Sequence, residues 1–311
     1  MTTTIFIDGS SAPDPRASHP STAARPAAAR PAGSRAAAGA KLSFGGLLRA
    51  ERIKLSSLRS IRFTLAATLA AGFGLSGLIA LLWNSEAMAP AGTQTAAELQ
   101  QYLLMTASIS APFIALVFGV LGVLVMSSEY ASGLILSTLV AAPRRTAVFM
   151  AKAVVLAATA AITAIIVIGG GLLIGVLFQP AAAEQVFKTQ VMTGALGTAA
   201  YLTLLALFAF GIATLTRNAA AGIGIVAGVT FVAPIAFSML MMANWEWVPT
   251  VIDYLPTQLG NTLSMGIIPA ADAAAAGVSG VGYAGSLLAM VVWAAVTVIP
   301  AAIVFRRRDA H

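Results

Sequence analysis

Six long apolar stretches constrain this chain more than any other feature of its sequence. Each has about 20 residues or more, which is enough for a helix to cross a hydrocarbon core of about 30 Å. Of the 311 residues, 59% are hydrophobic and only 9% are charged, whereas a soluble domain carries about 25% charged residues. The chain therefore needs lipid as its solvent, and the expected spans are 63–83, 102–126, 154–178, 191–215, 219–242 and 283–305.

The basic residues predict how these spans are oriented. Each span should be a helix, because open backbone finds no hydrogen-bond partners in lipid. If both termini are cytoplasmic, every Lys and Arg except Lys188 lies on the inner side, while the outer segments carry mainly acidic residues. This is the positive-inside pattern of membrane proteins. The predicted fold is an all-α membrane protein with six transmembrane helices and both ends in the cytoplasm.

The chain before the first span divides into two parts. Residues 1–40 are rich in Ala, Pro, Ser and Arg and lack apolar periodicity, so we expect a disordered cytoplasmic tail rather than a signal peptide. Residues 41–60 begin the transmembrane domain, 41–311, with a basic amphipathic helix that should lie in the membrane surface. Its apolar face is formed by Phe44, Leu47, Leu48, Leu55 and Leu58.

One acidic residue, Glu51, falls within this apolar face, and Arg59 flanks it. The interpretation that we favour is a local pair with Lys54, three residues further along the helix. The alternative is a salt bridge to a neighbouring cytoplasmic loop or a contact with a partner protein. The sequence leaves both open.

Two features interrupt the apolar pattern in the second half of the sequence. Pro234 should kink the fifth span, because proline removes one backbone hydrogen bond. The segment from Val248 to Ile268 is apolar but broken by prolines and glycines, so it is too interrupted to span the membrane. It is either a pair of short helices that dip back toward the membrane, which we favour, or an ordinary surface loop.

Several residue types and motifs that other functions need are missing. No expected span contains an ionisable residue in its interior, which disfavours an ion-coupled carrier. Cysteine is absent and the two histidines lie in opposite tails, so we expect no metal, no cofactor and no catalytic site. No phosphate-binding GxxxxGK[ST] loop occurs, so ATP hydrolysis is not expected in this chain. The basic residues form short clusters between apolar spans, which does not indicate nucleic-acid binding.

The segment from Ser127 to Lys152 is the only long charged segment between two spans with more than one basic residue. Its centre, 134–140, is largely apolar, and Glu129, Arg144 and Arg145 lie at its edges. An apolar patch with charged edges suits a protein interface. We expect a cytoplasmic loop of about 25 residues through which a partner drives the membrane part.

Four stretches occur in a recognisable order between Lys41 and the C-terminus. They are AERIKLSSLRS, SSEYASGLILSTLVAAPRR, LTRNAAAG with Arg217, and YLPTQLGNTL, and the chain ends in a basic RRRDA segment before His311. With these motifs the chain resembles the permease subunits of bacterial ATP-binding-cassette exporters, the type-two class that includes many drug and antibiotic efflux systems. The match lies in the following residues: Glu51, Lys54, Leu55, Arg59, Glu129, Tyr130, Gly133, Thr138, Leu139, Pro143, Arg144, Arg145 and Lys152.

The resemblance implies a partner and a mechanism. Two six-span units would pair, as a homodimer or with a sister permease, and bind two cytosolic ATPase subunits in the bacterial cytoplasmic membrane. The first inner loop would form a coupling helix, with Glu129, Tyr130, Gly133, Thr138, Pro143, Arg144 and Arg145 contacting the ATPase. ATP binding would then move a hydrophobic or amphipathic cargo, such as a drug, antibiotic or lipid, outward.

Simpler interpretations of the same residues stay open. Arg144 and Arg145 could only anchor the third span at the membrane surface. Glu129 could cap a short helix, Gly133 could only form a turn, and Tyr130 could be an interface aromatic. For the whole chain, the alternative to a permease is a membrane scaffold or assembly protein without transport activity.

Overall fold

The computed structural model describes residues 43–83, 94–133, 145–268 and 280–307, so the expected tail, 1–40, lies outside it. Within these ranges every regular element is helical, and residues 42–311 form one compact unit. Six helical segments there are long and apolar enough to cross a membrane: Arg59–Trp83, Ala96–Ser132, Arg145–Phe178, Thr189–Thr216, Ala219–Ala243 and Gly282–Arg307. The prediction of six spans is confirmed.

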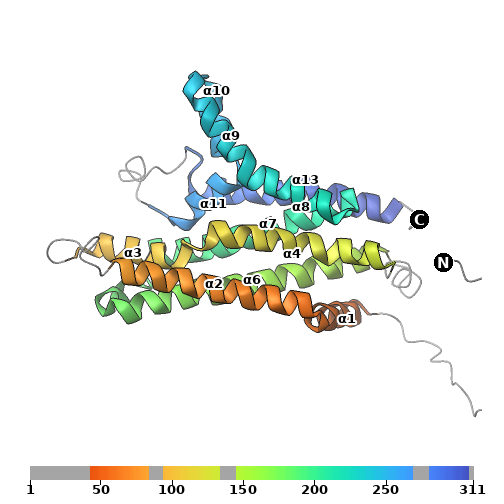
Figure 1. Cartoon of the computed structure of the whole chain (residues 1–311), viewed down its shortest axis with the longest axis horizontal. Helices are drawn as coiled ribbons and strands as arrows, with labels where there is room; N and C mark the ends of the chain where they lie inside the picture. Colours follow the sequence, from red (N-terminus) through yellow and green to blue (C-terminus); the bar gives the residue numbers. More distant parts are fainter. Residues whose placement is uncertain (1–42, 84–93, 134–144, 269–279, 308–311) are drawn as a thin grey trace, which may run out of the picture. The chain divides into compact units, whose positions relative to one another are not determined.

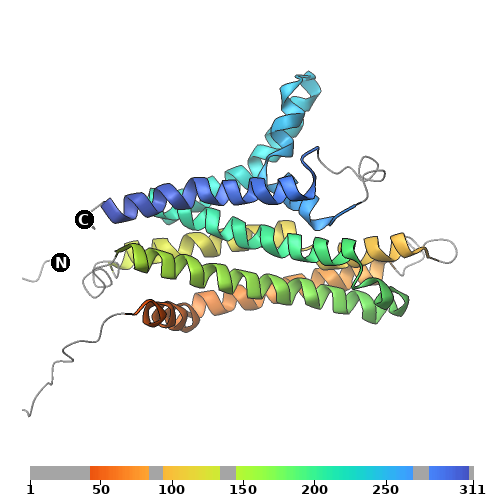
Figure 2. The same ribbon diagram turned by 180° about the vertical axis from the view of Figure 1, so that it is seen from behind.

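Helix α7 (Thr189–Thr216) is the centre of the bundle. It packs against α4 (Ala111–Ser132), α6 (Arg145–Phe178) and α13 (Gly282–Arg307), as Figures 1 and 2 show from opposite sides. Helix α2 (Arg59–Trp83) packs on the other side of α6. Each contact with α7 buries an apolar helix face, so α7 is surrounded by protein along most of its length.

The seam between α4 and α7 depends on a glycine. At Gly122 of α4, a Cβ atom would overlap the backbone carbonyl oxygen of Ala206 on α7. The two helix backbones therefore approach more closely than any side chain at this position allows, which is how small residues permit helix packing in membranes.

The amphipathic helix is shorter than the sequence predicts. Helix α1 covers Phe44–Ser57, and its N-cap residue Ser43 accepts a hydrogen bond from the Gly46 N–H. Leu58 is extended and α2 begins at Arg59, so Arg59 belongs to the first span rather than to the amphipathic helix. Because Leu58 interrupts the helix, α1 can take a direction of its own against α6.

The second span is broken into two helices, which the sequence did not predict. Helix α3 (Ala96–Ser108) begins with a capping box formed by Thr95 and Glu98 and ends before Ser110. Helix α4 then starts at Ala111 with Pro112 in its first turn. Proline has no N–H and cannot continue the hydrogen bonding of the preceding helix, so the backbone restarts at this point.

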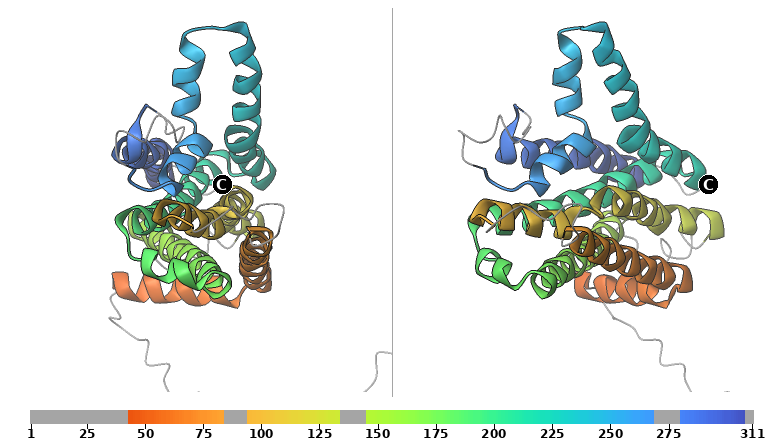
Figure 3. Two further views of the ribbon diagram at one scale, coloured as in Figure 1. Left: turned by 90° about the vertical axis from the view of Figure 1, so that its left-hand side faces the viewer. Right: turned by 60° about the vertical axis from the view of Figure 1, so that its left-hand side comes forward.

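The fifth span is also irregular, as the proline predicts. It consists of α8 (Ala219–Ala227), a π-helical turn (Gly228–Val232), α9 (Ala233–Leu240) and a 3-10 turn (Met241–Ala243). The π turn ends two residues before Pro234, and proline is a usual cause of helix kinks. Beyond it, α9 and α10 (Trp247–Asp253) form the hairpin visible in Figure 3, where Trp245 and Trp247 stack with ring centres 5.7 Å apart.

A pair of short helices does occupy the segment after the fifth span. Helix α10 is followed by α11 (Pro256–Ser264), which packs against α7 and α13. Its Leu259 and Leu263 are fully buried, and a Cβ on Gly260 would meet the ring of Tyr201 on α7. The interpretation of 248–268 as a surface loop is therefore wrong for α11.

A further 3-10 segment, Pro180–Gln185, joins α6 to α7.

Candidate functional site

Four charged side chains meet where α1, α4 and α6 come together. The Nζ atom of Lys152 lies 2.8 Å from Oε2 of Glu51 and also contacts Oε1 of Glu129. The same Oε1 atom is contacted by Nζ of Lys54. These residues, Glu51, Lys54, Glu129 and Lys152, form what we call the charge cluster. It lies at the end of the bundle that the positive-inside pattern predicts to be cytoplasmic.

Three of the four side chains in the charge cluster are shielded from solvent, whereas the side chain of Lys54 is 32% exposed. Only 1% of Lys152 and 3% of Glu129 is exposed, and Glu51 is also buried. Ions in a low-dielectric environment are costly unless they are paired, and the cluster contains two cations and two anions. Oε2 of Glu129 nevertheless has no hydrogen-bond partner among the described residues. Each member therefore depends on the others, and the three helices are held to one another by their pairing.

The favoured prediction for Glu51 is wrong. Glu51 pairs with Lys152 on α6, and Lys54 pairs with Glu129 on α4, instead of with each other. The alternative of a salt bridge to a neighbouring segment describes the observed contact better, although the partner lies in a helix and not in a loop. A side chain on the buried face of α1 points toward α6, where Lys152 is the available cation.

The predicted loop from Ser127 to Lys152 is also shorter than expected. Helix α4 continues to Ser132 and α6 begins at Arg145, so Glu129 and Tyr130 belong to the last turns of α4. The helices can continue past the apolar spans because Glu129 and Lys152 neutralise each other. Of the predicted contact residues, Thr138, Pro143 and Arg144 lie outside the described part of the chain.

Gly133 ends α4 with φ of 69°, the left-handed conformation that glycine adopts most readily at a helix C-terminus. This agrees with its interpretation as a turn. Gly133, which ends α4, thus lies four residues after Glu129 of the charge cluster.

The neighbour of Glu129 in the chain, Tyr130, makes a different connection. The Arg217 guanidinium carbon lies 5.3 Å from the centre of the Tyr130 ring, which is a cation–π contact. Arg217 ends α7 in a left-handed conformation, with φ of 54°, and Asn218 then caps the start of α8. Two successive residues of α4 therefore contact different helices. Glu129 contacts α1 and α6, and Tyr130 contacts the turn between α7 and α8.

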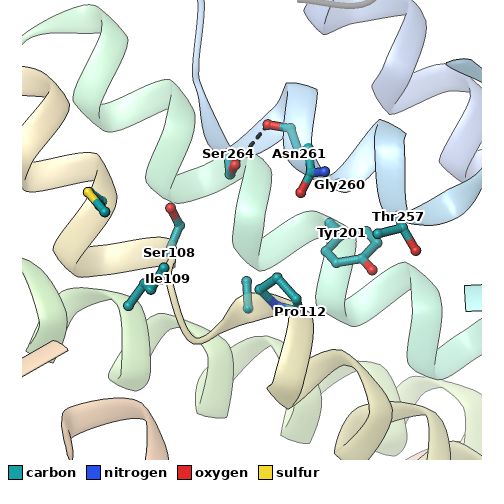
Figure 4. A pocket seen from close by; sticks show the side chains of 10 residues that line it. Ser108, Ile109, Pro112, Tyr201, Thr257, Gly260, Asn261 and Ser264 are labelled. Carbon is teal, nitrogen blue, oxygen red and sulfur yellow. Dashed lines mark hydrogen bonds between the residues drawn. The ribbon is translucent and has the colours of Figure 1, made fainter. Parts of the chain in front are cut away.

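A second polar site lies at the break in the second span. A cavity of about 180 Å³ opens between the α3–α4 junction, α7 and α11 (Figure 4). Its polar lining residues are Ser108, Tyr201, Thr257, Asn261 and Ser264. No hydrogen bond to the side-chain amide of Asn261 is found within the described residues, so this amide is available to a bound group. The sequence indicated neither the break nor the cavity.

Thr257, at the edge of this cavity, compensates for the proline in the fifth span. Pro234 has no N–H to donate to the carbonyl of Thr230, four residues earlier. The hydroxyl of Thr257 on α11 donates a hydrogen bond to that carbonyl over 2.5 Å. The sequence shows that the Thr230 carbonyl needs a donor, but nothing in it identifies a donor on another helix.

Replacing Thr257 with valine should lower the free energy of unfolding by about 1–3 kcal/mol, the cost of an unsatisfied buried carbonyl. Thr203→Val is the matched control, because among the described residues the Thr203 hydroxyl bonds only to Ala199 in its own helix. Unfolding of the purified proteins in mixed micelles would measure both. Equal stabilities of the two variants would show that the contact between α11 and the fifth span is not important for stability.

Taken together, the fold and these two sites define a multi-pass α-helical membrane protein. At one end of the bundle the helix ends are joined by buried ion pairs, and toward the other end a short helix packs among the spans. The family comparison agrees with this class. The chain belongs to the ABC-2 family of transporter proteins, whose family model matches residues 47–233. This match runs from α1 to the start of α9. None of the curated proteins matches the chain.

Family membership has consequences for the role of the chain. It is the membrane component of an ATP-binding-cassette transporter, and a component of this kind is not itself catalytic. It also implies that the chain pairs with an ATP-binding-cassette ATPase.

Proposed function

We propose that this chain is the permease of an exporter, which moves a hydrophobic or amphipathic substrate outward when separate ATPase subunits bind and hydrolyse ATP. The observation that carries the proposal is the charge cluster, which joins the cytoplasmic end of α4 to α1 and α6. The protein acts in the bacterial cytoplasmic membrane, with both termini inside.

The segment after Gly133 is the part that contacts the ATPase. It connects α4 to α6, and both flanks are tied to other helices, through Glu129, Lys152 and Tyr130. Because the Glu129–Lys152 pair is buried and the Tyr130–Arg217 contact is half-buried, a displacement of the segment moves α1, α6 and the α7–α8 turn together. Thr138, Pro143, Arg144 and Arg145 contribute to the ATPase contact itself.

The cavity beside Asn261 contacts the polar part of the substrate. Its volume of about 180 Å³ is below the roughly 300–1,000 Å³ of a pocket that encloses a drug-sized ligand. It therefore holds only a headgroup or a similar hydrogen-bonding fragment, while the apolar remainder stays against the helices. Discontinuous membrane helices are common at transport sites for the same reason, since they expose backbone polar groups.

The permease works as a pair, with a second copy or a sister chain. In the fifth span only 11% of an apolar stretch of 18 residues is buried inside the protomer, compared with 61% in the second and fourth spans. The fifth span therefore has the most surface left for a second subunit or for lipid.

The alternative function, a scaffold without transport activity, would use the charge cluster only for stability. The two functions differ in one respect, since a scaffold does not need to transmit ATP turnover. An ion-coupled carrier is a weaker alternative, because the expected spans contain no ionisable residue in their interior.

Co-purification with candidate ATPases from the host membrane, followed by ATPase and transport assays on the complex, tests the proposal. We expect a stable ATPase partner that is lost when 134–144 is replaced by a Gly/Ser linker of equal length. Glu129→Gln should retain the ATPase and its turnover but lose at least tenfold in substrate moved per ATP. Glu184→Gln, which changes an exposed carboxylate on the 3-10 segment, is the control.

Two outcomes would contradict the proposal. Absence of an ATPase partner in mild detergent, with the chain folded, would favour the scaffold. Unchanged transport per ATP in both Glu129→Gln and Gly133→Ala would show that the charge cluster and the end of α4 do not transmit the movement.

A further inference from the structure

A groove of about 490 Å³ runs between α1 and α6, and none of the four residues of the charge cluster lines it. Two kinds of residue line it. Arg49 and Arg52 project from one face of α1, three residues apart. The opposite wall is largely apolar and belongs to α6, with Val154, Val155, Ala158, Thr159 and Ile162.

The two arginines carry charges that the protein does not neutralise. Both are exposed, and neither has an ion pair or hydrogen bond to another described residue. The nearest acidic residue on the same helix, Glu51, is buried and bound to Lys152. The charge cluster is neutral overall, so the groove has an uncompensated charge of two at its rim.

The wall of the groove has the properties of a surface for an acyl chain. Val154 and Ile162 are 43% and 58% exposed, and Ala158 lies between them on the same face of α6. These residues follow one another at intervals of four, over about 12 Å at 1.5 Å per residue. The wall runs from the arginines toward the middle of the third span, which is the direction that a lipid tail takes from the membrane surface.

We propose that this groove binds one anionic phospholipid. Its phosphate lies between Arg49 and Arg52, and one acyl chain lies along Val154, Ala158 and Ile162. Guanidinium groups bind phosphate oxygens with two parallel hydrogen bonds, which fixes the headgroup more firmly than a single ammonium ion does. A soluble phosphate would satisfy the arginines but would leave the apolar wall uncovered.

The bound lipid gives α1 a second attachment to α6. The first is the Glu51–Lys152 pair, on the buried side of α1. The lipid contacts Arg49 and Arg52 instead, and no residue of the charge cluster lines the groove, so the two attachments use different residues of α1. This inference depends on the membrane location of the cytoplasmic helix ends, and it does not depend on coupling to an ATPase.

The test is native mass spectrometry of the full-length protein, together with its thermal unfolding in vesicles of pure phosphatidylcholine or with one-fifth phosphatidylglycerol. We expect one phosphatidylglycerol to be retained per chain and the melting temperature to rise with it. Arg49→Gln combined with Arg52→Gln should reduce retention at least tenfold and abolish the rise, with unchanged melting in phosphatidylcholine. Ala158→Trp, which fills the apolar wall, should also reduce retention.

Arg306→Gln combined with Arg307→Gln is the control, because it removes two basic residues at the cytoplasmic end of α13, away from the groove. Equal retention by the Arg49/Arg52 variant and the wild type would overturn the proposal. Equal loss in the control variant would show a general surface-charge effect instead. Inorganic phosphate raising the melting temperature as much as the lipid would show an anion site without lipid specificity. If the chain retains the lipid but has no ATPase partner, the missing partner contradicts the exporter function alone and the lipid proposal stands.

Discussion

Replacing Lys152 with methionine should lower the free energy of unfolding by about 3–5 kcal/mol, the cost of breaking a buried ion pair by removing one partner. Lys152 is 1% exposed and contacts both Glu51 and Glu129. Methionine fills similar volume, so the loss comes from the charges. Glu129 would keep Lys54 as a partner, whereas Glu51 would remain buried without a cation.

A second substitution isolates this cause. Combining Lys152→Met with Glu51→Gln removes one charge of each sign and leaves the Lys54–Glu129 pair intact. The double variant should therefore recover most of the lost stability. Lys188→Met changes an exposed position before α7, and its free energy of unfolding should stay within about 0.5 kcal/mol of that of the wild type. Unfolding in mixed micelles measures all three, and a double variant as unstable as the single one would contradict the electrostatic explanation.

The second large effect is expected for Gly122→Ala, which should lower the free energy of unfolding by about 3 kcal/mol or more. The added Cβ would overlap the backbone carbonyl oxygen of Ala206, and it also lies 3.0 Å from the Cβ of Ala209. A backbone atom cannot rotate away as a side chain can. Helices α4 and α7 would have to separate along their seam, with loss of packing over several turns.

Gly74→Ala on α2 is the matched control, because a Cβ there meets no other atom within 4 Å. That variant should be as stable as the wild type or more stable by up to about 1 kcal/mol, since alanine favours the helix. The yield of monodisperse protein and its melting temperature would compare the two. Similar behaviour of both variants would mean that α4 and α7 can separate at little cost.

Sequence reasoning predicted the number and the approximate limits of the spans because length and apolar content are local properties. It could not predict how far the helices continue beyond the apolar spans. That depends on Glu129 meeting Lys152, 23 residues away, and on Glu51 meeting Lys152, 101 residues away. A charged residue after an apolar span indicates a loop unless its partner in space is known.

The candidate site, too, could be predicted only in part from the sequence. The motif residues Glu51, Glu129 and Lys152 were identified from the sequence, but their mutual pairing was not. Pro234 predicted an irregular fifth span, whereas Pro112 lies inside an apolar stretch and its effect on the second span was missed. The compensating Thr257 hydroxyl could not be predicted, because only the position of α11 brings it to the Thr230 carbonyl.

The composition of the charge cluster has a consequence for biosynthesis. Its members are translated in the order Glu51, Lys54, Glu129 and Lys152, and they belong to segments on both sides of the first two spans. Glu129 can meet Lys54 once the second span is inserted, but Glu51 has no partner until the third span emerges from the ribosome. The amphipathic helix therefore reaches its final attachment only after half of the chain has been made.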